Sequence, residues 1–80
     1  MSATVLERLA ALLVSRFGVS EGEIRPDVTF ADLDLDSLSL VEFAMVAEKE
    51  FGIPFGEDDV SPQGTVIEAV ELIGARLVGT

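Results

Sequence analysis

Ser37 is the side chain in this 80-residue sequence whose type and position best suit a chemical role. It follows a run of acidic residues and stands where an apolar pattern of helical spacing begins. A serine at the start of a helix holds its hydroxyl clear of the helix body, beside backbone N–H groups that have no partner within the helix. Such N–H groups favour a nearby anion. The position of Ser37 is therefore suited to carrying a phosphate group.

Few other side chains offer chemistry to a catalyst. Histidine, cysteine, tyrosine and tryptophan are all absent. No serine–histidine or cysteine–histidine pair can be built, so carboxylates are the only groups left for acid–base work. We predict that the chain is not an enzyme. The absence of cysteine also leaves packing as the source of stability and fits a reducing compartment.

A calcium-binding loop is the sharpest alternative that the acids suggest. Asp32, Asp34 and Asp36 stand at alternate positions, as at the opening of an EF-hand loop. The sixth position of such a loop needs glycine and the twelfth needs glutamate, but here they are Ser37 and Phe43. We therefore predict no metal site.

Size and charge restrict the class of protein and its partners. Eighty residues, 49% of them apolar, form one small domain over residues 1–80. The net charge is −10, and twelve of the fifteen acids lie between residues 21 and 59, where only Arg25 and Lys49 oppose them. Nucleic acid and anionic membranes are poor partners for such a surface, and basic proteins are good ones. The alternative is that the acids only keep a small protein soluble.

The location is predicted from what the sequence lacks. The N-terminus has no basic segment of the kind that precedes a signal sequence, and the apolar stretches are too short to cross a bilayer. We expect a soluble cytoplasmic protein and a monomer.

Three helices are predicted to position Ser37. The first runs from an N-cap at Thr4 to about Phe17, and the second from Ser37 to Phe51 after an N-cap at Asp36. The third opens at a capping box over residues 65–68. The predicted core positions are Leu6, Leu9, Leu13, Phe17, Leu40, Phe43, Ala44, Ala47, Phe51, Val66, Val70, Ile73 and Leu77.

Between the first two helices the sequence predicts a long ordered loop over residues 27–36. Its apolar anchors are Val28, Phe30, Leu33 and Leu35. A short helix is expected near residues 57–60, and no segment has the sustained period of two that a strand requires. The fold class is therefore all-α, a small antiparallel bundle of three main helices plus one short helix.

The second helix has a second apolar stripe. Leu38, Val41 and Met45 lie about 130° from its predicted core face on a helical wheel, flanked by Glu42 and Glu48. A helix in a bundle needs one buried face, so the surplus stripe suits a partner-binding surface. The alternative is that the stripe packs beneath the long loop.

Over roughly residues 5–78 the sequence resembles the acyl carrier proteins. The resemblance rests on Phe30, on the run Leu-Asp-Leu-Asp-Ser-Leu at 33–38, on Val-Glu at 41–42 and on the segment 48–54. It implies that a phosphopantetheinyl transferase moves 4'-phosphopantetheine from coenzyme A onto Ser37. The terminal thiol of that arm would then hold an acyl chain as a thioester, in fatty acid or polyketide biosynthesis.

The resemblance also implies which enzymes dock and where. The expected partners are the transferase, a ketosynthase, an acyltransferase and other synthase enzymes with basic docking patches. The residues that the resemblance assigns to docking are Asp36, Leu38, Val41, Glu42, Met45 and Glu48.

The sequence departs from the family pattern at two positions. Many carriers have glycine where Asp34 stands, and a further acid where Lys49 stands. A peptidyl carrier and an unmodified acidic adaptor remain as alternatives, although peptidyl carriers usually have a glycine-containing pair where Leu35 and Asp36 stand. Because the sequence begins with methionine and has no linker at either end, we expect a freestanding carrier.

Overall fold

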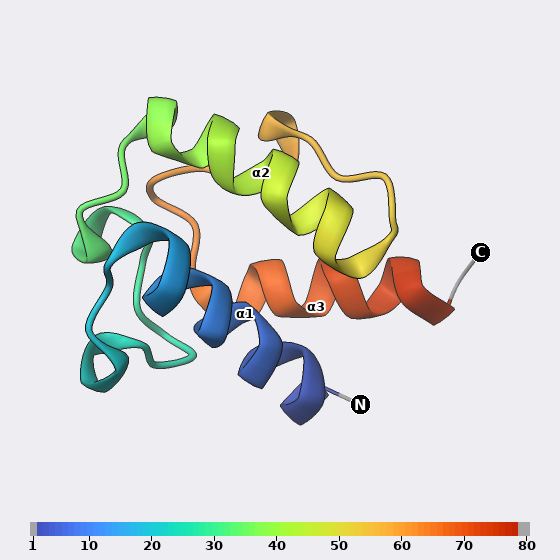
Figure 1. Cartoon of the computed structure of the whole chain (residues 1–80), viewed down its shortest axis with the longest axis horizontal. Coiled ribbons are helices and arrows are strands. Elements are labelled where there is room, and N and C mark those ends of the chain that lie inside the picture. The colour runs from blue at the N-terminus through green and yellow to red at the C-terminus, as the bar shows by residue number, and fades with distance from the viewer. Residues whose placement is uncertain (1, 79–80) are drawn as a thin grey trace.

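The computed structural model describes residues 2–78, and the side chains of residues 5–78. Its helices are α1 (Ser2–Phe17), α2 (Ser37–Phe51) and α3 (Val66–Val78), with three short 3₁₀ segments, η1 (Glu21–Glu23), η2 (Ala31–Leu33) and η3 (Glu57–Asp59). In Figure 1, α1 runs in the direction opposite to α2 and α3. The described residues contain no strand, only an isolated bridge between Thr29 and Thr65. The all-α bundle is thus confirmed, with three short segments where one short helix was expected.

Capping residues set both ends of α2 and the start of α3 as predicted. Asp36 is the N-cap of α2, and Gly52 ends that helix in the left-handed conformation, with φ 67°. At the start of α3 the capping box is complete. The Thr65 N–H donates to Glu68 Oε1 at 3.1 Å, and the Glu68 N–H donates to Thr65 Oγ1 at 3.3 Å.

The predicted start of α1 is wrong. The helix begins at Ser2, so Thr4 lies inside it and is not its N-cap. Residues 2–4 include no glycine or proline that would keep the helix from extending toward the N-terminus. The side chain of Thr4, like all of Met1, lies outside the described part of the chain.

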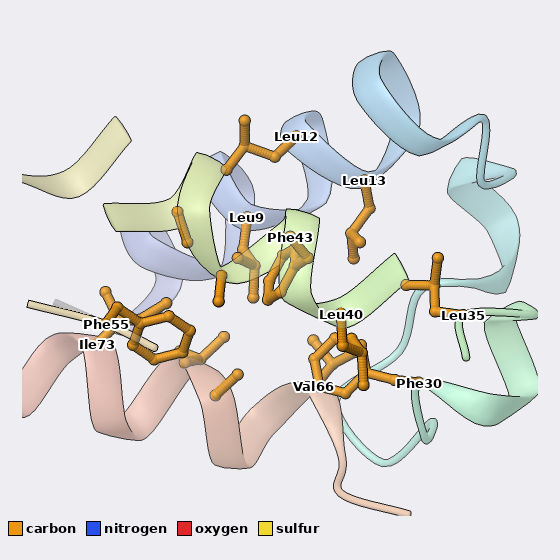
Figure 2. Packing of buried hydrophobic residues seen from close by; sticks show 14 of the residues in the cluster. Leu9, Leu12, Leu13, Phe30, Leu35, Leu40, Phe43, Phe55, Val66 and Ile73 are labelled. Atoms are coloured by element: carbon orange, nitrogen blue, oxygen red, sulfur yellow. The ribbon is translucent and has the colours of Figure 1, made fainter. Parts of the chain in front are cut away.

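A core centred on Phe43 joins the three helices (Figure 2). The ring centroid of Phe43 lies 5.4 Å from that of Phe30, 6.0 Å from that of Phe17 and 6.5 Å from that of Phe55. Such spacings favour offset and edge-to-face contacts between aromatic rings. All five predicted core residues of α2 are buried, namely Leu40, Phe43, Ala44, Ala47 and Phe51.

Some predicted core positions are less buried than expected. Leu6 and Phe17 are half-buried, and Leu77 is exposed. Leu77 lies on the apolar side of α3 but in its last turn, which extends beyond the ends of α1 and α2 in Figure 1. Within residues 2–78 no helix combines the length and the apolar content that a membrane span needs.

The long loop is ordered by burial and by backbone hydrogen bonds. All four of its predicted anchors are buried, which confirms them: Val28, Phe30, Leu33 and Leu35. The Phe30 N–H donates to the Gly64 carbonyl at 3.1 Å, and the Val66 N–H donates to the Val28 carbonyl at 2.9 Å. The loop therefore occupies one of the N–H groups that the start of α3 cannot satisfy within the helix.

A partly buried ion pair ties η3 to α3. The guanidinium of Arg76 donates to both carboxylate oxygens of Asp59, at 2.8 and 3.0 Å, and to the Pro54 carbonyl at 2.9 Å. The hydrogen bonds from Arg76, and then the one from the Gly56 N–H, hold the pKa of Asp59 below its usual value. This contact fixes the connection between α2 and α3.

Candidate functional site

Ser37 is the first residue of α2, and it is exposed. The residue before it fixes the start of the helix, because Asp36 Oδ1 accepts a hydrogen bond from the Ser39 N–H at 2.9 Å. This hydrogen bond, and then one from the Ser39 hydroxyl, hold the pKa of Asp36 below its usual value. The carboxylate of Asp36 is therefore charged at neutral pH, one residue from the Ser37 hydroxyl.

The loop before Ser37 makes a sharp turn at Asp34. This residue has φ 65° and ψ 28°, the left-handed conformation, and its N–H donates to the Ala31 carbonyl at 2.9 Å. Leu35 follows as a buried anchor, and its N–H donates to the Phe30 carbonyl at 3.0 Å. Ser37 thus lies two residues after a fixed point in the core (Figure 2 shows Leu35).

An open hollow of about 360 Å³ lies beside Ser37. It is lined by Ala31, Asp34, Leu35, Asp36, Ser37 and Pro62. Because the hollow is open to solvent, a group attached to the Ser37 hydroxyl has room without displacing the packed core.

The second stripe of α2 forms an exposed ridge, which we call the α2 ridge: Leu38, Val41 and Met45. Leu38 is 79% exposed and Met45 is 57% exposed, whereas Val41 is half-buried. Glu42 and Glu48, which flank the ridge, are exposed. The alternative that the stripe packs beneath the long loop is therefore wrong for Leu38 and Met45.

The acids of the loop do not converge on a common centre. Asp34 and Asp36 both line the hollow beside Ser37, but Asp32 does not. Among the described residues there is no group of three or more acidic side chains placed to hold a metal ion. Phe43, which takes the twelfth position of the calcium-loop alternative, is fully buried in the core.

A second hollow, which no pattern in the sequence predicts, borders the α2 ridge at Met45. Its volume is about 280 Å³, and it is lined by Arg16, Glu42, Met45, Val46, Lys49 and Glu50. We call it the Arg16–Lys49 hollow. Lys49 is a departure from the acyl carrier pattern, but no pattern in the sequence places Arg16 of α1 beside it.

Comparison with known protein families gives a match that covers most of the chain. The family model described as the phosphopantetheine attachment site matches residues 7–73, which include the long loop, Ser37 and all of α2. Domains of this family carry a covalently attached 4'-phosphopantetheine group. They are generally non-catalytic carriers, and they interact with synthase enzymes and phosphopantetheinyl transferases. With most of its residues matched, the chain belongs to the phosphopantetheine attachment family and is a phosphopantetheine-binding carrier protein.

Proposed function

We propose that Ser37 carries the 4'-phosphopantetheine arm, and that the chain is an acyl carrier in fatty acid or polyketide biosynthesis. The observation that supports this most directly is the exposure of Ser37 at the first position of α2, beside an open hollow. Two other serines are less suitable. The Ser15 hydroxyl already donates to the Ala11 carbonyl at 2.8 Å, and Ser39 is half-buried.

The residues around Ser37 fit a phosphate ester. The first N–H groups of α2 have no partner within the helix, and they favour the negative charge of a phosphate. The negative charge of Asp36 opposes this attraction. Because the phosphate would be exposed to solvent, both effects on it are small. The arm supplies a thiol that binds acyl groups as thioesters, which this cysteine-free chain cannot supply itself.

The α2 ridge would be the surface on which separate enzymes dock. Its exposed apolar side chains provide anchors, while Asp36, Glu42 and Glu48 attract basic residues of a partner. In this function the transferase, the ketosynthase and the acyltransferase bind the ridge in turn and act on the arm next to it.

The attachment site is tested by intact mass after incubation with coenzyme A and a broad-specificity phosphopantetheinyl transferase. We expect the wild-type chain to gain one phosphopantetheine group and Ser37→Ala to gain none. Ser39→Ala is the matched control, and it should be modified like the wild type. A Ser37→Ala chain that still gained the group would overturn the assignment, and a wild-type chain that gained none would favour the unmodified acidic adaptor.

Docking on the ridge is tested by the rate of the same reaction. Leu38→Ala should lower kcat/KM for arm attachment several-fold, because an exposed apolar anchor is lost without any change in charge. Val14→Ala on α1 is the control, since Val14 is also a partly exposed apolar residue, at 40%, but lies outside the ridge. Equal rates for Leu38→Ala and the wild type would count against docking at this position.

The pathway is tested by the group that the arm carries in the cell of origin. We expect intact mass of the chain purified from its own host to show a fatty acyl or polyketide intermediate as a thioester. An aminoacyl or peptidyl group would contradict this assignment and favour the peptidyl carrier.

A further inference from the structure

Two of the five basic residues of this acidic chain have no acidic partner in the described structure. The ion pairs are Arg8 with Glu50 at 3.4 Å, Arg25 with Asp27 at 3.9 Å, and Arg76 with Asp59 at 2.8 Å. Within residues 2–78, Arg16 and Lys49 form no ion pair and are exposed. Their charges are therefore free to meet a charge on another molecule.

Both free cations line the Arg16–Lys49 hollow. Arg16 comes from the last turn of α1 and Lys49 from the last turn of α2, so the tertiary structure brings them together. Met45 of the α2 ridge lines the same hollow and supplies an apolar wall. Two carboxylates, Glu42 and Glu50, also line it, but Arg8 already pairs with Glu50, so the two cations face one carboxylate that has no ion pair in the described structure. The hollow thus joins positive charge to an apolar anchor, on a protein with a net charge of −10.

The charged residues beside the α2 ridge therefore change sign along one side of the helix. Lys49 follows Met45 by four residues and Glu42 by seven, so the three side chains lie along one side of α2. Along this side of α2, the order is acidic at Glu42, apolar at Met45 and basic at Lys49. Lys49 follows Ser37 by twelve positions, which correspond to roughly 18 Å along the helix axis. A docked partner that matches this order can lie in only one orientation relative to Ser37.

We propose that the Arg16–Lys49 hollow receives an acidic side chain of a docked enzyme, an aspartate or glutamate next to an apolar side chain that contacts Met45. The proposal rests on the function proposed above, because the docked proteins are the enzymes that act on the arm. Arginine binds carboxylates through paired hydrogen bonds, and lysine adds a second positive charge. A partner with basic residues alone would place like charges against this end of the ridge, which disfavours it.

A second copy of this chain is a poorer occupant than an enzyme. Two copies with a charge of −10 each repel one another over the whole surface. A partner that is basic opposite Asp36 and Glu42, and acidic only opposite Arg16 and Lys49, meets attraction along the full ridge. The hollow therefore favours a partner whose docking patch is basic, with one acidic residue at the edge that lies away from Ser37.

The test uses the full chain without its arm and two synthetic stapled helices. Both peptides carry two leucines one turn apart, preceded one turn earlier by an arginine. One turn after the second leucine, the first peptide has glutamate and the second has lysine. Dissociation constants are measured by fluorescence anisotropy at about 0.15 M salt, where attraction over long distances is largely screened.

We expect Lys49→Glu to raise the dissociation constant of the glutamate peptide about threefold or more, and to lower that of the lysine peptide. Arg16→Glu should act in the same way. Arg25→Glu is the matched control. Arg25→Glu changes the net charge by the same amount, but Arg25 lies in the loop that follows α1 and does not line the hollow. The dissociation constants of both peptides should therefore change by the same factor. The milder Lys49→Gln, with thermal melting of every variant, separates lost binding from lost folding.

If Lys49→Glu changed the dissociation constants of both peptides by the same factor, the proposal would be overturned. The absence of saturable binding by either peptide would also overturn it. Self-association of the wild type in sedimentation, abolished by Lys49→Glu, would identify a second copy as the occupant and would also overturn it. Arm attachment to Ser37 is measured separately by mass. A failure of the proposed function therefore appears in the mass measurement, and a failure of this inference appears in the peptide affinities.

Discussion

Asp34 adopts a backbone conformation that disfavours most side chains. Its φ of 65° lies in the left-handed region, where glycine is free and where aspartate is tolerated better than most residues. The resemblance to acyl carriers had singled out this position, because many of them have glycine there. The structure provides the physical reason, since the turn before Ser37 requires a positive φ whichever residue occupies it.

Substitutions at Asp34 test this conformation. The left-handed region costs alanine about 1–2 kcal/mol, and glycine loses part of that advantage through its greater freedom in the unfolded chain. We therefore expect Asp34→Gly to be more stable than Asp34→Ala by roughly 1 kcal/mol in urea unfolding. Both variants remove the same charge, so they control for one another. Equal stabilities would mean that the turn does not hold a positive φ in solution.

The carboxylate of Asp36 should make stability depend on pH. The Ser39 N–H and hydroxyl bind its charged form and lower its pKa in the folded protein. The stabilisation is therefore complete above the ordinary aspartate pKa of about 3.9 and is lost as the pH falls through the lowered value. Asp36→Asn keeps an N-cap side chain without the titration. As the pH falls from about 5 to about 2, we expect the melting temperature of Asp36→Asn to decline less steeply than that of the wild type.

At the scale of the helix, two glycines should respond in opposite ways to the same substitution. Gly74 lies inside α3, and an added Cβ would meet no atom within 4 Å. We expect Gly74→Ala to raise the free energy of unfolding by about 1 kcal/mol, and the melting temperature by roughly 4–8 °C. Gly52 caps α2 with φ 67°, so Gly52→Ala should lower stability by about 1 kcal/mol. Shifts of the same sign in both variants would contradict these helix assignments.

At the scale of the whole molecule, repulsion among its negative charges should limit the stability of the folded protein. Twelve acids lie between residues 21 and 59, and the net charge is −10. Repulsion among them weakens as salt screens it. We expect the melting temperature to rise with NaCl and with millimolar MgCl₂ through this screening. A melting temperature that responds to neither salt would exclude the repulsion, and a response to MgCl₂ alone at equal ionic strength would indicate a specific cation site instead.

Features that depend on neighbouring residues were predictable from the sequence. The N-cap Asp36, the terminal Gly52 and the capping box at Thr65 and Glu68 are confirmed, because each involves hydrogen bonds or backbone angles within a few residues. The same holds for the core face of α2, which follows from helical periodicity. The failures at Thr4 and Leu77 have a different cause. How far a helix extends, and how much of its last turn is covered, depends on the surrounding elements.

The sequence by itself determined the helices, their apolar sides and the position of Ser37 at the start of α2, since these depend on the order of residues along one element. Only the tertiary structure decided whether the second apolar side of α2, beside its predicted core face, is also covered. It left Leu38 and Met45 exposed, and it brought Arg16 and Lys49, 33 positions apart in the chain, to one hollow. Periodicity describes the faces of a single helix, whereas exposure and charge pairing depend on what the rest of the chain places against each face.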